Sequence, residues 1–205
     1  MKNKGNISDL LSHLKKSNFN DFISHKTLLY GDTDTKKTFY TAKFIQFLIE
    51  TKKVSPKDIS VLDFAPKLKV IQNVRIGGKI EEFYKNSITC NNITFEGNII
   101  PPRLNARNKA ELYEIACNNF QKTKKVLKIF NENPTSILII NDISLYLHIG
   151  SIKLLLESIN RSDTFFGNTY YGTSIKSDFS TLFSLREIRL VKYLIKKIEF
   201  SYFTG

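Results

Sequence analysis

The sequence predicts an α/β protein, with residues 1–205 forming one domain around a doubly wound, mostly parallel sheet. Short apolar runs typical of buried parallel strands alternate along the chain with amphipathic helical patterns. Two of these runs end in carboxylates, Asp63 and Asp142, and ligands bind at the carboxyl ends of such strands. A chain of 205 residues, 41% of them hydrophobic, is long enough for one sizeable core.

The first elements of the chain lead to a glycine. Ile7 to Lys16 repeats apolar residues at helical spacing and predicts a short helix. Thr27 to Tyr30 predicts a strand that ends at Gly31, and Thr38 to Glu50 carries most of its apolar residues on one helical face. We therefore expect a strand, a polar loop and an amphipathic helix in direct succession.

The loop between this strand and this helix has the pattern of a phosphate-binding loop with one substitution. The P-loop pattern is G-x-x-x-x-G-K-[ST], and Gly31, Lys37 and Thr38 occupy their places while Lys36 replaces the second glycine. In this motif backbone N–H groups surround phosphate, the lysine reaches the β/γ-phosphates and the hydroxyl binds Mg²⁺. A lysine at the glycine position adds a Cβ where unusual φ/ψ angles are needed, so we expect binding to survive better than turnover. The alternative is a polar loop that shows this spacing by chance.

The middle of the chain predicts a buried strand followed by an irregular segment. Ile59 to Phe64 is a continuous apolar run whose C-terminal end holds Asp63. Residues 65–104 contain several prolines, a Gly-Gly pair and a β-rich segment at residues 87–100. We interpret residues 65–104 as an insertion after the second strand that lies over the ligand-binding face.

The second half of the chain continues the alternation of helix and strand. Asn105 to Asn131 predicts a long helix with an apolar stripe, and Thr135 to Asp142, with four consecutive aliphatic residues, predicts a buried strand. The remaining expected elements are a helix from Ile149 to Asn160, a strand from Thr164 to Tyr171 with Asn168 near its end, a helix from Arg186 to Lys197 begun by the capping-box spacing of Ser184 and Glu187, and an edge strand from Ile198 to Phe203.

Composition limits the classes of partner and location. The net charge of +12 favours polyanions, so nucleotides, nucleic acid and acidic protein surfaces are all candidates beside the simpler interpretation of a solvated basic surface. No apolar run is long enough to span a bilayer, and the N-terminal residues lack a signal-peptide pattern, so we expect a cytoplasmic protein without a membrane partner. The two cysteines and three histidines lack metal-binding spacing, and we expect both thiols to be reduced.

The order of these elements resembles the three-layer P-loop NTPases from Leu28 to Tyr171, although only the P-loop and the strand ending at Asp142 are specific. A strand placed between these two strands is similar to the RecA-like and AAA-like branch of that superfamily, here with a degenerate Walker A motif. The resemblance implies that the chain binds a nucleotide, with ATP the first candidate, and Mg²⁺. The nucleotide contacts it implies are Gly31, Thr35, Lys36, Lys37, Thr38 and Asn168, and the implied Mg²⁺ ligands are Thr38 and Asp142.

The resemblance also shows where the hydrolytic machinery differs. A glutamate that positions the attacking water often follows the Walker B aspartate, but Ile143 follows Asp142 here. Asp63 is our candidate for the catalytic carboxylate, against the alternative that it caps a loop at a strand end. Asn168 resembles a polar sensor of the γ-phosphate, against the alternative of a turn asparagine.

Three functions are left open. The first is an ATP-binding protein with weak or partner-dependent NTP hydrolysis. The second is a phosphotransferase in which Asp63 is the base and residues 65–104 form the acceptor site. The third is a non-enzymatic basic module that binds nucleic acid or protein and retains the fold. The oligomeric state is left open, including a homo-oligomer.

Overall fold

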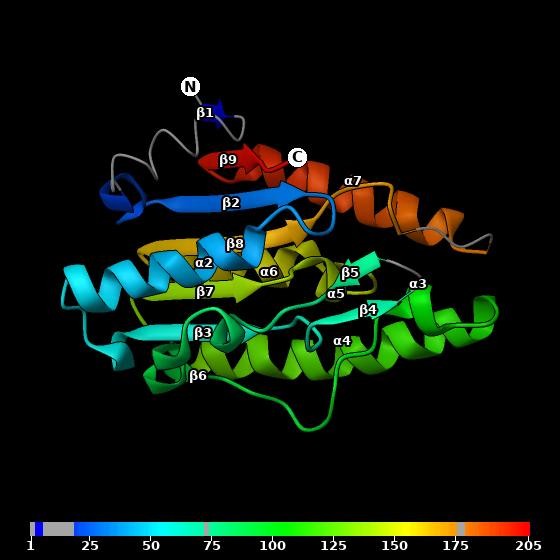
Figure 1. The fold of residues 1–205 in the computed structure, drawn as a ribbon, viewed down its shortest axis with the longest axis horizontal. Helices are drawn as coiled ribbons and strands as arrows, with labels where there is room; N and C mark the ends of the chain where they lie inside the picture. Colours follow the sequence, from blue (N-terminus) through cyan, green and yellow to red (C-terminus); the bar gives the residue numbers. More distant parts are fainter. Residues whose placement is uncertain (1–2, 6–18, 72–73, 176–178) are drawn as a thin grey trace.

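A parallel sheet forms the centre of the computed structural model, which describes residues 3–5, 19–71, 74–175 and 179–205 (Figure 1). Within these residues the sheet has seven strands, and all its pairs are parallel. Their order across the sheet is β1 (Asn3–Gly5), β9 (Phe200–Phe203), β2 (Lys26–Gly31), β8 (Thr164–Tyr170), β7 (Ile137–Asn141), β3 (Ile59–Asp63) and β6 (Asn91–Asn92). The predicted α/β class and parallel sheet are therefore confirmed.

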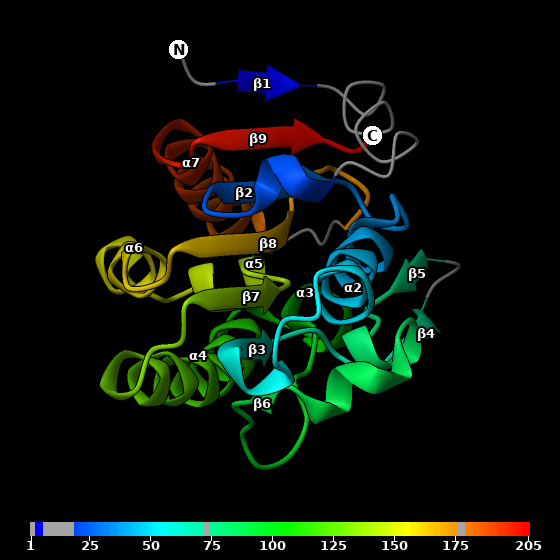
Figure 2. The ribbon, with the colours of Figure 1, turned by 90° about the vertical axis from the view of Figure 1, so that its left-hand side faces the viewer.

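Helices cover both faces of the sheet (Figure 2). One face packs against α2 (Lys37–Gln46), which continues as a π-helical turn (Phe47–Thr51), and the other packs against α4 (Lys109–Glu132), α6 (Ile152–Asn160) and α7 (Thr181–Lys197). Neighbouring strand residues point to opposite faces, so Leu138 joins one core cluster and Ile139 joins the other. Burial on both faces explains why the strands are continuous apolar runs.

The segment between β3 and α4 lies near the carboxyl edge of the sheet. It contains a hairpin of β4 (Lys69–Ile71) and β5 (Val74–Ile76), two 3₁₀ turns (Ile80–Glu82 and Lys85–Thr89), β6 and the short helix α3 (Pro102–Asn105). The predicted β-rich segment at residues 87–100 is wrong, since it contributes only the two-residue β6. The Asn92 side-chain amide donates to the carbonyls of Ser87, Ile88 and Cys90, and such local bonds compete with a strand ladder.

Two predictions near the C-terminus are also wrong, namely the start of the last helix and the edge position of the last strand. The helix α7 begins at Thr181, and Glu187 is buried in an ion pair with Arg103, so it is not the end of a capping box. The strand β9 is not an edge strand, because it pairs with β2 on one side and with β1 on the other. The predicted helix at residues 7–16 lies outside the described residues, and α5 (Ser144–Leu147) was not expected.

Among the described residues, no helix has both the length and the apolar character needed to cross a membrane.

Candidate functional site

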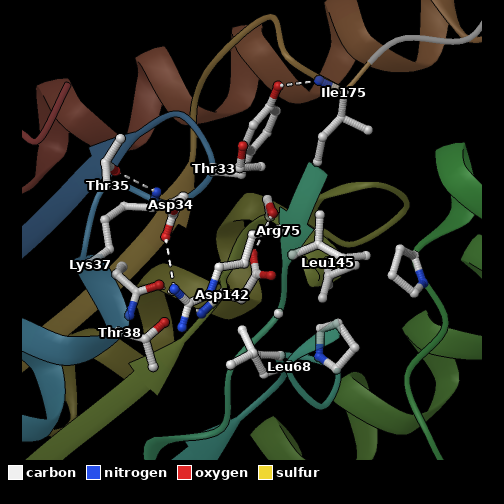
Figure 3. Close-up of a pocket in the computed structure, with 18 of the residues that line it drawn as sticks. Thr33, Asp34, Thr35, Lys37, Thr38, Leu68, Arg75, Asp142, Leu145 and Ile175 are labelled. Carbon is white, nitrogen blue, oxygen red and sulfur yellow. Dashed lines mark hydrogen bonds and ion pairs between the residues drawn. The ribbon is translucent and has the colours of Figure 1, made fainter. Parts of the chain in front are cut away.

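A cavity of about 380 Å³ lies at the carboxyl edge of the sheet (Figure 3). The loop at residues 32–36, which joins β2 to α2, forms one wall. The other walls come from residues 65–68 and 75–77, from Phe83, from α3, from the start of α5 and from the end of β8. The cavity therefore lies where parallel α/β sheets place their ligands.

The backbone of the loop has the conformation that the glycine of the pattern would favour. Lys36, at the glycine position, has φ 62° and ψ 15° and lies in the left-handed region, and Asp34 also has a positive φ of 53°. Lys36 immediately precedes α2 and makes no side-chain cap to its first N–H groups. Backbone N–H groups beside left-handed residues form concavities that bind anions. The substitution has therefore not removed the left-handed backbone conformation at this position.

We expect Lys36→Gly to raise the free energy of unfolding by about 1 kcal/mol, because a side chain in the left-handed region is strained. We also expect it to tighten ATP binding, since Lys37 still supplies the positive charge. Lys36→Ala removes the charge and keeps the Cβ, so titrating both variants with ATP at two salt concentrations separates strain from charge. Lys53 has φ 58° away from the cavity, so Lys53→Gly should change stability alone. Weaker ATP binding by Lys36→Gly would show that the lysine is a phosphate contact.

The ammonium group of Lys37 is folded back into its own loop. Its Nζ donates to the carbonyl oxygen of Asp32 and, at 3.0 Å, to Oγ1 of Thr35. Thr35 Oγ1 also hydrogen-bonds to Thr204 Oγ1 at 2.8 Å, which ties the loop to the end of the chain. Burial lowers the pKa of Lys37 to about 8, against the opposing field of Asp142 and the loop aspartates.

This pKa predicts a pH dependence of anion binding. Lys37 is half charged near pH 8 in the free protein, and a bound phosphate favours the ammonium form. Binding should therefore take up a proton, and ATP affinity should fall as the pH rises above about 8. Titration calorimetry in buffers of different ionisation enthalpy measures the uptake. Lys37→Arg remains charged over this range and should lack the decline; the same decline in that variant would assign it to another group.

A buried network of amides connects the loop helix to the strand ends. Thr38 Oγ1 donates to Asn141 Oδ1 at 3.1 Å, and Asn168 Nδ2 donates to the same oxygen at 2.8 Å. Asn168 also donates to Thr41 Oγ1 at 2.9 Å and accepts from the Asp142 backbone N–H at 3.0 Å. The predicted residues Thr38, Asn168 and Asp142 are thus brought together, and Asn141, which was not predicted as a site residue, is the direct partner of the Thr38 hydroxyl.

Asp142 lies in the cavity wall just beyond β7. Its φ is 58°, and its Oδ1 accepts a hydrogen bond from Ser144 Oγ at 2.6 Å. Burial raises the pKa of this carboxyl, while the Ser144 bond and the Lys37 charge oppose the rise. The described residues contain no cluster of three or more His, Cys, Asp or Glu that could hold a metal. Mg²⁺ would therefore depend on Thr38, Asp142, phosphate and water, which suits its preference for few protein ligands.

Asp63 lies at the end of β3 but does not line the cavity. Its carboxylate accepts from the backbone N–H groups of Ala65 at 3.1 Å and Ile80 at 2.7 Å, and from Asn141 Nδ2 at 2.8 Å. Lys79 Nζ lies 3.6 Å from the same carboxylate. These contacts favour the alternative that Asp63 caps the loop after its strand, and a catalytic role for it stays a prediction.

The cavity is also lined by two arginines, Arg75 and Arg103, which from the sequence could contact phosphate or an acidic partner or could be solvated surface, and by His148, which was given no role. Arg103 and His148 line its inner wall, and both contact Glu187 of α7. The chain positions of Arg103 and Glu187 are far apart, and no spacing in the sequence connects them. Arg75 lies beside Asp34 at 3.9 Å across the opening (Figure 3).

Comparison with known proteins adds no family. No family model matches the sequence, no curated protein matches it significantly, and the same is true of solved structures. The class that the fold defines is an α/β protein with a parallel central sheet and a cavity at its carboxyl edge.

Proposed function

We propose that this chain binds the phosphates of a nucleoside triphosphate, ATP being the first candidate, in the loop from Gly31 to Thr38. The observation that carries the proposal is the left-handed backbone of Lys36 immediately before α2. Left-handed residues in such turns favour a concavity of N–H groups, and a helix N-terminus favours anions. The position of β8 between β2 and β7 supports it, because it brings Asn168 of β8 into contact with the backbone of Asp142 and with the helix that follows the loop.

We infer that turnover is slow or depends on a partner. Only two of the described acidic residues line the cavity, Asp34 and Asp142, and Ile143 stands where a water-positioning glutamate would follow. The hydroxyl of Thr38 is bonded to the neutral Asn141. The protein then acts through binding, with the bound nucleotide as a switch.

Thermal unfolding with Mg-ATP, Mg-GTP, metal-free ATP and no ligand tests the proposal. A ligand at 100 times its dissociation constant stabilises the folded state by about 2.7 kcal/mol. We expect stabilisation by at least one nucleoside triphosphate. No stabilisation by any of them, together with salt-dependent DNA binding, would favour the basic nucleic-acid-binding module instead.

A phosphotransferase is the second candidate, because half of the cavity is apolar. Leu68, Leu145 and Ile175 also line the cavity (Figure 3). Apolar side chains offer no hydrogen bonds to phosphate groups, whereas they can pack against an organic acceptor. ADP release that depends on an added alcohol, followed by ³¹P NMR, would support this candidate over hydrolysis.

We expect Asp142→Asn to weaken ATP binding more with Mg²⁺ than without it, because the lost charge acts through the ion. Calorimetric titration with Mg-ATP and with ATP in EDTA measures both affinities. Asp34→Asn is the matched control, since Asp34 also lines the cavity but its nearest charged partner is the exposed Arg75. Equal losses with and without Mg²⁺ would remove Asp142 from the metal site.

A further inference from the structure

A buried charged cluster of Arg103, Glu187 and His148 joins α3, α7 and α5 behind the cavity. Arg103 Nη2 lies 2.7 Å from Glu187 Oε2, and His148 Nε2 lies 3.1 Å from the same oxygen. The side chains are only 7%, 2% and 2% exposed. Arg103 also donates from Nη1 to Ser184 Oγ at 3.1 Å.

The cluster is incompletely satisfied. Within the described part of the chain, Glu187 Oε1 and His148 Nδ1 are buried without a hydrogen-bond partner. Buried ion pairs add little net stability compared with apolar packing, and unsatisfied buried polar atoms in a folded protein call for an explanation. Packing alone therefore gives no reason for a buried guanidinium beside the cavity, whereas an anionic ligand of Arg103 would. The unpartnered Glu187 Oε1 is an acceptor and is not explained by an anion.

Arg103 has donors left for that ligand. A guanidinium has five N–H donors, and in residues 19–71, 74–175 and 179–205 its bonds are those to Ser184 and Glu187. Arg103 and His148 both line the cavity, whereas Glu187 does not. His148 Nε2 is hydrogen-bonded to Glu187 Oε2, while Nδ1 of the same ring has no partner among the described residues.

The cluster and the phosphate loop share one cavity. The Arg103 guanidinium lies 5.1 Å from the centre of the Tyr170 ring, and Tyr170 is the register partner of Gly31, at the start of the loop. Adjacent strands lie about 4.8 Å apart. The start of the loop at Gly31 is therefore about one strand spacing from the backbone of Tyr170, whose ring contacts Arg103. Lys37 and Arg103 thus both line this cavity.

We propose that Arg103, oriented by Glu187 and Tyr170, binds a phosphoryl group in the cavity. The site would then prefer a nucleoside triphosphate, or a diphosphate together with a separate phosphate, over a diphosphate alone. The chemistry recognised is a phosphate dianion, for which the planar guanidinium fork is suited. Its source is either the γ-phosphate of the nucleotide or a separate inorganic phosphate beside a diphosphate. This proposal rests on the nucleotide site of the preceding section.

The ion pair between Arg103 and Glu187 links the cavity to α7. Glu187 is on α7, and the neighbouring Arg186 donates to the carbonyls of Leu147, His148, Ile149 and Gly150 after α5. A phosphate that competes with Glu187 for Arg103 would therefore weaken a contact between α3 and α7.

The test compares the affinities of ATP, ADP and ADP with inorganic phosphate by calorimetry. The variants are Arg103→Lys, which keeps a charge opposite Glu187 but removes the fork, and Arg103→Gln with Glu187→Gln, which removes both charges. Each should lose about tenfold in ATP affinity, the worth of a charge-assisted hydrogen bond, with ADP affinity unchanged. If Arg103 binds a separate inorganic phosphate, that phosphate should raise the ADP affinity of the wild type. It should then no longer raise the ADP affinity of the variants.

Arg107→Gln is the matched control, because Arg107 lies in the same segment and its side chain is 87% exposed. It should bind all ligands as the wild type does. If the double variant fails to fold, the ATP and ADP affinities of Arg103→Lys alone test the role of Arg103. Unchanged ratios of ATP to ADP affinity and unchanged phosphate effects in the variants would overturn the role of Arg103 and leave the nucleotide site standing. A wild-type protein that binds neither nucleotide nor phosphate would overturn both proposals.

Discussion

Lys37→Ala is expected to weaken ATP binding by about 100-fold, because the proposed site relies on this ammonium group for charge-assisted hydrogen bonds to phosphate. The fold should persist, since among the described residues the hydrogen bonds of Nζ go to Asp32 and Thr35 of its own loop. Titration calorimetry gives the affinity, and circular dichroism gives the fold.

The matched control for this variant is Lys43→Ala. Lys43 is on the same helix, is exposed and bonds to Gln46 Oε1 at 2.8 Å. It should bind ATP as the wild type does. Equal affinities of the Lys37 and Lys43 variants for ATP would contradict a phosphate-binding loop.

Arg103→Ala is expected to lower the free energy of unfolding by about 3–5 kcal/mol, because it leaves the carboxylate of Glu187 buried without its guanidinium. Changing Arg103 and Glu187 together to glutamine removes both charges and should cost less than the single change. Urea denaturation at constant pH measures these differences.

Arg107→Ala serves for comparison in this series. Its ion pair with Glu111 lies on the surface of the first turn of α4, and such pairs contribute less than about 1 kcal/mol. A loss for Arg103→Ala no larger than that for Arg107→Ala would show that Glu187 is solvated or neutral in the folded protein.

The sheet could be predicted from the sequence because its strands are buried on both faces. Ile137–Asn141 and Ile59–Asp63 are continuous apolar runs ending in polar residues, a pattern few other elements produce. The place of the loop between β2 and α2 followed from the same periodicity. The edges were harder to predict, since β9 is internal only because residues 3–5 pair with it.

The side of the cavity opposite the loop could not be predicted. Arg103 and Glu187 meet across a fold whose segment after β3 has no regular period, and the partner that buries Glu187 is decided by tertiary packing. The sequence also could not tell which of Asn141 and Asp142 faces Thr38. Consecutive strand residues point to opposite sides of the sheet. An error of one residue in the predicted position of β7 would therefore place Asp142 instead of Asn141 opposite Thr38.

The most direct test of the central claim is a ¹H–¹⁵N correlation spectrum of the labelled protein titrated with Mg-ATP. If the loop holds the phosphates, the largest amide shifts should fall on residues 32–38, with smaller shifts at Asp142 and Asn168, and Lys37→Ala should lose them. Shifts confined to residues outside the cavity, or no saturable shifts at millimolar Mg-ATP, would contradict the phosphate-binding role of this loop.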